Sequence, residues 1–281
     1  NAVDPFEALE TYGADAIRWY FYTNSAPWLP NRFYGKAVVE GQRKFMGTLW
    51  NTYAFWVLYA DIDSFDPTKY SLKDCTLTVM DRFILSRLNT TVAETDDHLA
   101  NYRIPEAAKS LSTFVDELSN WYVRRCRERF WGKDMSEDKI AAFMTLYTCL
   151  VTIAKASAPM IPFMAEDIYR NLVCNVDKNA PISVHLCDYP VSDAKLINAD
   201  LEASMDEVLN IVVLGRAARN TANIKNRQPI GKMFIGADKA LDDEYVSIIT
   251  EELNVKCAEF TNDASAFLTY NIKPNLKILN L

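Results

Sequence analysis

Helical spacing of apolar residues, sustained over most of the first 175 positions, is the feature that most constrains the fold of this chain. Long helices are predicted at residues 32–60, 79–100, 105–130, 137–156 and 161–173. Most connections between them are short and are polar or marked by a proline, such as Pro159 or Pro162. Helices joined by short loops pack antiparallel. The sequence therefore predicts a fold that is mainly α, with an antiparallel helical bundle at its centre.

A shorter helical stretch precedes the bundle. Asp4 has the side chain of an N-cap, and Pro5 fits the first position of a helix. This first helix is expected to end at Gly13. We therefore expect a helical connector over residues 1–32 and the bundle over residues 33–192.

The pattern changes after residue 192. Helices are predicted at residues 201–223 and 242–253. Short strand-like runs are predicted at residues 233–235, 255–260 and 267–270. Because strands and helices alternate here, we expect a small α/β domain over residues 193–281.

The composition is that of a globular protein, with room for two cores in its 281 residues. Its six cysteines are scattered without a Cys-x-x-Cys pair, which is typical of reduced thiols in a cytoplasmic protein. No apolar run approaches the roughly 20 residues that span a bilayer, and the N-terminal residues do not form a signal peptide. We therefore expect a cytoplasmic location and no membrane partner. The absence of an initial methionine suggests a fragment of a longer chain.

The sequence offers no motif for catalysis. It contains no Gly-rich phosphate loop, no Gly-x-Ser-x-Gly elbow and no metal-ligand spacing. Its two histidines, His98 and His185, are too few for a His-rich metal site. We therefore expect no catalytic residue, no metal and no cofactor within this segment.

Basic residues gather in two places, although the formal net charge of the chain is −7. The first cluster lies between Trp121 and Lys133 and contains one acid, Glu128. The second lies between Glu207 and Asp238, where no acid occurs. Such clustering suits a polyanionic partner that is bound at defined places.

One face of the predicted helix at residues 105–130 combines arginine with tryptophan. Arg124, Arg127 and Trp131 fall together at spacings of three and four, and Lys133 follows them. Guanidinium groups bind phosphate and an indole stacks on a base, so this face is suited to unpaired RNA. The alternative is a solvated helix end, favoured by the helix dipole, with Trp131 in the core.

Two further arginines of the first cluster lie on another side of the same helix. Arg125 and Arg129 continue the apolar stripe formed by Leu118 and Trp121. We expect these two arginines to be structural and to pair with acids of a neighbouring helix.

The second basic cluster begins on the predicted helix at residues 201–223. Its polar residues that share one side by helical spacing are Arg216, Arg219, Asn220 and Asn223. Lys225 and Arg227 follow on the loop that leaves the helix. We predict that all six contact RNA, because asparagine can read base edges and the cations can bind phosphates. The alternative is a solvated helix end joined to a basic loop.

Three motifs of the expected bundle resemble a known family. They are residues 48–53 (TLWNTY), 118–131 (LSNWYVRRCRERFW) and 158–166 (APMIPFMAE). All three are similar to the anticodon-binding helical bundle of class I aminoacyl-tRNA synthetases for Ile, Val and Leu. Residues 1–5 (NAVDP) and 13–19 (GADAIRW) resemble the stretch that follows the mobile lysine loop of these enzymes.

The tail of the chain separates the isoleucyl from the valyl enzymes. Residues 223–229 (NIKNRQP), 252–256 (ELNVK) and 273–277 (KPNLK) look like the C-terminal domain of isoleucyl-tRNA synthetases. The resemblance covers essentially the whole chain. The ATP-binding catalytic fold, the lysine loop, the editing domain and the zinc-binding C-terminal extension of some bacterial members are absent from this sequence.

The resemblance implies that the parent protein is an ATP-dependent isoleucine–tRNA ligase that uses ATP and magnesium. The segment alone would be inactive, and would bind the anticodon stem-loop of tRNA-Ile to place the acceptor end in a distant active site. Its partners would be that tRNA and the catalytic and editing domains of the same polypeptide, in a monomeric enzyme. Two alternatives remain, namely the same region of a valyl enzyme and a helical protein-interaction scaffold.

Overall fold

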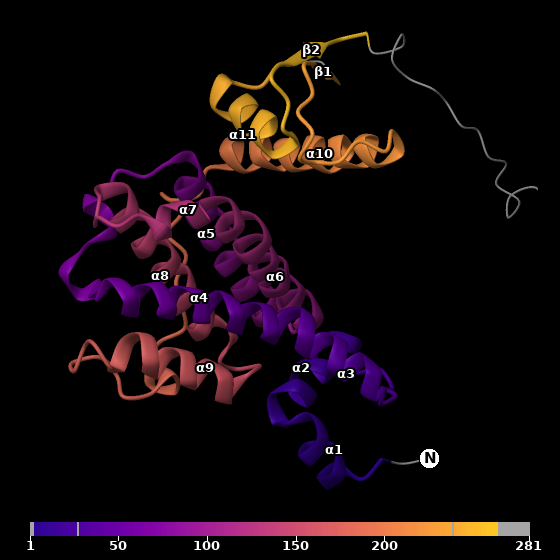
Figure 1. Ribbon diagram of the computed structural model, residues 1–281. Coiled ribbons are helices and arrows are strands. Elements are labelled where there is room, and N and C mark those ends of the chain that lie inside the picture. The colour runs from indigo at the N-terminus through magenta and orange to yellow at the C-terminus, as the bar shows by residue number, and fades with distance from the viewer. Residues whose placement is uncertain (1–2, 27, 238, 264–281) are drawn as a thin grey trace, which may run out of the picture. The chain divides into compact units, whose positions relative to one another are not determined.

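A series of helices makes up the first of the two units into which the chain divides, Asn1–Ala199 and Asp200–Leu281. The structure is a computed structural model that describes residues 3–26, 28–237 and 239–263. Helices dominate the first unit, which confirms the prediction of a mainly α fold (Figure 1). The strand expected at residues 267–270 lies outside the described residues.

The long helices of the first unit form where the sequence predicts them, and three of them include a π-helical turn (η). The unit contains α1 (Pro5–Tyr12), α2 (Ala14–Asn24), α3 (Gly35–Gly41), η1 (Gln42–Gly47), α4 (Thr48–Asp63), α5 (Val79–Ala100), α6 (Ile104–Glu117), η4 (Leu118–Val123), α7 (Arg124–Trp131), α8 (Glu137–Ser157), α9 (Pro162–Tyr169) and η5 (Arg170–Cys174). Because η1 and η4 continue from the preceding helix and into the next, α3–η1–α4 and α6–η4–α7 are two long continuous helices. The short 3-10 turns are η2 (Pro67–Lys69), η3 (Leu72–Asp74) and η6 (Val184–Leu186).

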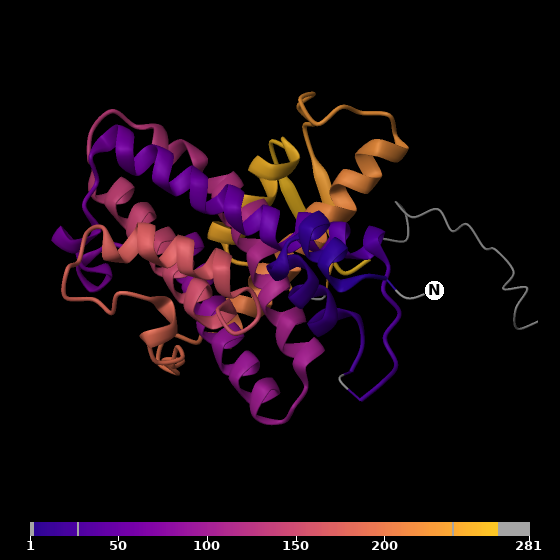
Figure 2. The same ribbon diagram turned by 90° about the horizontal axis from the view of Figure 1, so that it is seen from below.

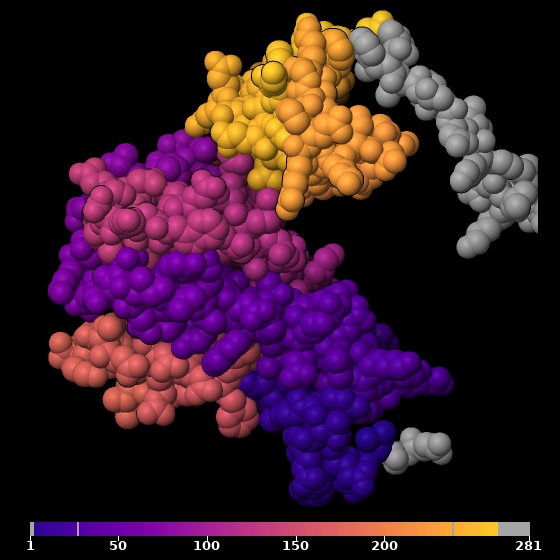
Figure 3. Space-filling model, in the orientation of Figure 1, coloured from indigo at the N-terminus to yellow at the C-terminus, as the bar shows by residue number. Residues whose placement is uncertain are grey.

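Figure 1 shows α4 crossing this unit, with α9 on one side of it and α6 on the other. The view from below places the first three helices at one end of the bundle, as the first view does (Figure 2). The outer face of α4 remains on the surface (Figure 3). Three apolar residues of α4 are exposed, namely Trp50, Leu58 and Ile62.

The described residues of the connector, 3–26 and 28–32, pack onto the bundle through hydrogen bonds that span much of the sequence. Both carboxylate oxygens of Asp15 accept backbone N–H groups at the start of α9, from Phe163 at 3.3 Å and from Met164 at 2.7 Å. The guanidinium of Arg18 donates to the carbonyl of Met160 at 3.2 Å. The expected connector therefore lies in the same compact unit as the bundle.

Helix α8 runs through the core of the unit. Among the described residues it is the one helix long and apolar enough to cross a membrane, with a mean hydropathy of 1.5 in its most apolar 18-residue window. The sequence argument overlooked this stretch. Of that window, 67% is buried inside the unit, and Trp56 of α4 donates its indole N–H to the carbonyl of Phe143 at 2.9 Å. The apolar character of α8 is thus that of a core helix.

A buried network of polar groups joins four segments of the bundle around Asp81, whose side chain has no solvent exposure. Arg129 of α7 donates from both terminal nitrogens to the two carboxylate oxygens, at 2.8 and 2.9 Å. The hydroxyl of Tyr122 donates to the same carboxylate at 2.6 Å. Thr78 and Asp81 form a capping box that begins α5. Arg129 also pairs with Asp138 at the start of α8, at 2.9 Å.

These contacts decide the charge state of Asp81. Burial by itself raises the pKa of Asp81, but the hydrogen bonds and charge of Arg129, with the hydroxyls of Tyr122 and Thr78, lower it below its ordinary value of 3.8. Burial and then the charge of Asp81 raise the pKa of Tyr122 well above 10. The network therefore holds a carboxylate and a guanidinium as a buried ion pair at neutral pH. This confirms the structural role expected of Arg129.

The second unit contains one long helix and a parallel pair of short strands. Its elements are α10 (Ala199–Thr221), β1 (Met233–Gly236), α11 (Asp243–Leu253) and β2 (Ala258–Thr261). Met233 of β1 is opposite Ala258 of β2, and α11 connects the two strands. Gly215 of α10 lies so close to Leu253 of α11 that a Cβ atom at this glycine would come within 2.4 Å of the leucine side chain. These elements match the predicted α/β pattern up to residue 263.

We predict that Asp81→Asn lowers the free energy of unfolding by about 3–5 kcal/mol at neutral pH, because Arg129 loses its fully buried charge partner and keeps only the exposed Asp138. Since the folded-state pKa of Asp81 is depressed, its contribution is present above the unfolded-state pKa and is lost as the pH falls through the folded value, below about 3.8. The substitution should therefore also reduce the acid dependence of stability. Denaturant unfolding from pH 7 to pH 2 measures both effects.

Asp138→Asn is the matched control, because this acid also pairs with Arg129 but its side chain is 53% exposed. We expect a loss of at most about 1 kcal/mol for the control. Equal losses for the two variants, or an unchanged acid dependence in Asp81→Asn, would contradict this account of the network.

Candidate nucleic-acid interface

The outer face of α7 presents the predicted cluster of arginine and tryptophan. Arg124 and Arg127 are exposed, Trp131 is 52% exposed, and Lys133 is exposed just beyond the helix. Arg124 donates from Nε to the carbonyl of Asn120 at 2.9 Å. The structure therefore brings Arg124, Arg127 and Trp131 onto one surface, and the alternative that places Trp131 in the core does not hold.

The inner side of the same helix explains why this face points outward. Trp121, Tyr122, Cys126 and Phe130 are all buried. Burial raises the pKa of the Cys126 thiol to about 11, so this side chain stays a neutral member of the core. Because the buried side chains fix the rotation of the helix, Arg124, Arg127 and Trp131 on the opposite side face the solvent. Arg125 is half-buried.

The C-terminal end of α7 is held by a buried lysine. The ammonium of Lys139, 2% exposed, donates to the carbonyl of Gly132 at 2.6 Å. The same ammonium pairs with Asp63 at the end of α4, at 2.6 Å. These contacts hold the backbone at Gly132, between Trp131 and Lys133, in position. The sequence analysis did not identify Lys139, because a lysine near the start of a helix normally faces the solvent.

Four residues of the second basic cluster lie on the surface of the second unit. Asn220, Asn223, Lys225 and Arg227 are all exposed. Asn223 follows the end of α10 and adopts a left-handed backbone conformation with φ of 56°, which asparagine tolerates better than most residues. The exposed set therefore lies on the last turn of the helix and on the loop after it.

The structure corrects the prediction for Arg219. Its side chain is buried, with 4% of the residue exposed. Its Nη2 atom donates to the carbonyls of Lys225 and Asn226, each at 3.2 Å, and to the carbonyl of Gln228. Helical spacing alone placed this arginine on an exposed side, but the chain folds back over it after α10 ends. Arg219 organises the basic loop from beneath and is not available to RNA.

Arg216 is corrected in a similar way. Its Nη2 atom pairs at 2.6 Å with Glu252 of α11, and 37% of the arginine side chain is exposed against 6% of the glutamate side chain. The charge of Arg216 is therefore balanced by an acid of the same unit. The expected single face of Arg216, Arg219, Asn220 and Asn223 is therefore not present.

A second tether of the basic loop was missed by the sequence analysis. The side-chain amide of Asn254 donates to the carbonyl of Asn226 at 3.2 Å. Asn254 ends α11 with φ of 49°, and its own carbonyl accepts from Ile230 at 3.0 Å. The loop between Asn223 and Ile230 is thus held by Arg219 on one side and Asn254 on the other.

Comparison with known families gives a match that includes these helices. The family model described as the anticodon-binding domain of tRNA ligase matches residues 81–235, more than half of the chain. This chain belongs to that family. The match begins at Asp81 and includes α7, so the exposed arginine and tryptophan face lies within the anticodon-binding domain.

Relatives of the whole chain are isoleucine–tRNA ligases. The protein of Clostridium novyi is 56% identical over 280 residues, that of Clostridium kluyveri 53% over 279, and isoleucine–tRNA ligase 2 of Bacillus cereus 42% over 281. Each alignment covers 99% of this chain but only 27%, 27% and 26% of the relative. The resemblance to isoleucyl enzymes is thereby confirmed, and the chain spans about a quarter of the length of these relatives.

A solved structure with a similar fold is that of LeuRS from Agrobacterium radiobacter K84, a ternary complex with tRNA and LeuAMS. The TM-score is 0.54 at 15% sequence identity, over 71% of this chain and 22% of that one. At this identity the likeness concerns the fold alone. It agrees with the helical bundle predicted from the sequence.

We predict that Arg219→Lys uncouples the basic loop from the rest of the second unit. A lysine keeps the charge, but its flexible side chain lacks the rigid guanidinium plane that holds Nη2 of Arg219 beneath the loop carbonyls. The effect of Arg227→Ala on tRNA affinity should therefore be smaller in the Arg219→Lys background than in the wild type, because a loose loop no longer presents Arg227 well. A double-mutant cycle on binding affinity measures this coupling.

Arg216→Lys is the control for this cycle, because it also replaces an arginine whose charge lies inside the second unit. In that background the full effect of Arg227→Ala should remain. The same loss from Arg227→Ala in all three backgrounds would show that Arg219 does not position the loop.

Proposed function

We propose that this chain binds the anticodon stem-loop of tRNA-Ile, and that it positions this tRNA for aminoacylation by the catalytic part of an isoleucine–tRNA ligase. The observation that supports this most is the face of Arg124, Arg127 and Trp131, which lies within the matched anticodon-binding domain. The relatives named isoleucine–tRNA ligase support the choice of isoleucine.

The chemistry of the face suits the loop of a tRNA. Bases in a single-stranded RNA loop are unstacked and can pack against an exposed aromatic ring, and Trp131 supplies such a ring. Arg124 and Arg127 lie one to two helical turns from it and supply charge for the phosphates on either side. Lys133, Lys225 and Arg227 supply further positive charge. Since these residues would bind and orient the tRNA without making or breaking covalent bonds, their contribution to aminoacylation is positioning.

We assign the reaction itself to the rest of the polypeptide. The parent would be an ATP-dependent ligase that acts in the cytoplasm as a monomer, with ATP and magnesium bound in the catalytic part. In the described residues, no group of three or more His, Cys, Asp or Glu side chains is placed to hold a metal ion. The catalytic and editing domains of the same polypeptide would then be the protein partners of this chain.

One observation favours the protein-interaction scaffold as a second candidate. Trp50, Leu58 and Ile62 follow one another at spacings of eight and four residues on α4 and form an exposed apolar stripe, with exposed fractions of 43%, 55% and 67%. Exposed apolar residues on one helix face are typical of a surface that contacts another protein. This stripe does not lie on α7, so a protein contact on α4 and RNA binding on α7 are compatible.

The test is a filter-binding titration with tRNA-Ile and tRNA-Val at two salt concentrations. We expect tighter binding of tRNA-Ile, and an affinity that falls with salt with a log–log slope of about 0.7–0.9 per phosphate contacted. Equal affinity for the two tRNAs would contradict the isoleucine assignment. A complete lack of binding at low salt, or an affinity that does not depend on salt, would favour the scaffold.

A further inference from the structure

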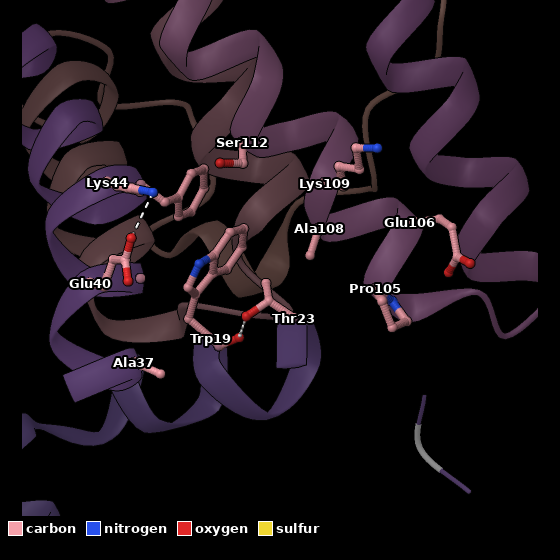
Figure 4. A pocket seen from close by; sticks show the side chains of 12 residues that line it. Trp19, Thr23, Ala37, Glu40, Lys44, Pro105, Glu106, Ala108, Lys109 and Ser112 are labelled. Carbon is pink, nitrogen blue, oxygen red and sulfur yellow. Dashed lines mark hydrogen bonds and ion pairs between the residues drawn. The ribbon is translucent and has the colours of Figure 1, made fainter. Parts of the chain in front are cut away.

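The first unit contains ion pairs of two kinds, on its surface and in its interior. On the surface, Lys44 pairs with Glu40 at 2.7 Å, and both side chains are more than half exposed (Figure 4). Such a pair contributes little to stability. The pair of Lys139 with Asp63 is different, because these side chains are 2% and 14% exposed. Removing charges from water costs free energy, so this interior pair requires an explanation.

The helix ends disfavour both charges of the interior pair. Lys139 is the third residue of α8, and Asp63 is the last residue of α4. A helix dipole favours acids at the start of a helix and cations at its end, which is the reverse of this arrangement. The caps are formed by other residues, because Ser136 caps α8 and Ser64 follows α4 in a left-handed conformation. Helix stability therefore does not explain the positions of Lys139 and Asp63.

The ammonium of Lys139 has a further partner outside both helices. It donates to the carbonyl of Gly132 at 2.6 Å, while Asp63 accepts from the same ammonium at 2.6 Å. Because Gly132 is exposed, water can bind this carbonyl in place of the ammonium. The bond is thus not needed to satisfy the carbonyl. What it adds is a fixed position for the backbone just after α7.

Trp131 lies between two residues that are held in place. On one side, Phe130 is buried and packs edge-to-face against Phe55 of α4 and Phe143 of α8, with ring centroids 5.1 and 5.0 Å apart. On the other side, Gly132 is bound to Lys139. The backbone of Trp131 is therefore fixed from both sides, although its side chain is 52% exposed.

We propose that Lys139 is a positioning residue for RNA binding, and that it holds Gly132 so that Trp131 and Lys133 keep one arrangement. This inference rests on the proposed function. Lys139 is too deeply buried to touch the RNA, so it acts through the backbone. Without it, residues 131–133 would move more freely at the end of α7. RNA binding would then have to restrict that motion, at a cost in entropy.

The test removes both charges from the full chain, in the double variant Asp63→Leu/Lys139→Met. Replacing a buried ion pair by apolar side chains of similar volume changes stability little, whereas the carbonyl of Gly132 loses its anchor. We expect a melting temperature close to that of the wild type and an affinity for tRNA-Ile that is about three- to tenfold weaker.

Ile153→Val is the control for stability. Ile153 is fully buried in α8, fourteen residues beyond Lys139, which corresponds to about 21 Å along the helix. Loss of a buried methylene group should lower the melting temperature by a few degrees. Because the anchor at Gly132 is intact, the affinity for tRNA-Ile should remain that of the wild type.

A double-mutant cycle then identifies the group that is positioned. The loss of affinity caused by Trp131→Ala should be smaller in the double variant than in the wild type. The loss caused by Arg227→Ala, which removes a cation of the second unit, should be the same in both backgrounds. A merely structural role of Lys139 would not produce this difference.

The proposal is overturned if the double variant binds tRNA-Ile like the wild type, or if Trp131→Ala has the same effect in both backgrounds. An equal loss of affinity in Ile153→Val would also overturn it, because the loss would then follow from stability. If neither Trp131→Ala nor Arg227→Ala weakens binding in the wild type, the proposed function itself fails. Where the double variant does not fold, Lys139→Gln replaces it in the same cycle, since glutamine is one atom shorter and cannot reach Asp63 and Gly132 together.

Discussion

The buried pair of Asp81 and Arg129 is the interaction on which the exposed α7 face, proposed to bind RNA, depends. Two parallel hydrogen bonds of 2.8 and 2.9 Å join the start of α5 to α7, and Asp138 extends the pair to α8. Removing one partner of a buried ion pair leaves an uncompensated charge, so the pair tolerates little rotation of α7. A helix fixed in this way holds Arg124, Arg127 and Trp131 in one orientation. Rigid presentation lowers the entropic cost of binding a flexible RNA loop.

In the second unit, too, an arginine with little solvent exposure holds the segment that presents exposed cations, but its partners are backbone carbonyls and not a carboxylate. Arg219 is buried beneath the basic loop and donates to carbonyls on both sides of Arg227. In both units an arginine that is largely or fully buried thus donates to the backbone, and exposed cations lie beside it. The two arginines look alike in the sequence because each lies in a basic cluster. Their roles are set by what the chain packs around them.

Much of the fold could be predicted from the sequence because local signals were strong. The helix at residues 79–100 was predicted from its apolar spacing with the ends that the structure gives it, and the structure shows a capping box of Thr78 and Asp81 at its start. The outward face of α7 and the structural role of Arg129 followed from helical spacing, because most of that helix is amphipathic. The chain's return over Arg219 could not be predicted, because spacing within a helix contains no information on a loop that follows it. The π turns η1 and η4 could not be predicted either, because a single π turn within a long helix does not change the apolar pattern enough to be recognised.

The account's central claim is that the α7 face and the basic loop of the second unit hold RNA. Hydrogen–deuterium exchange of the full chain, with and without a saturating amount of tRNA-Ile, tests this claim most directly. We expect slower amide exchange on tRNA binding at residues 124–133 and 220–228, with little change on the outer face of α4. Protection confined to α4, or unchanged exchange in both basic segments when tRNA-Ile is bound, would contradict the account.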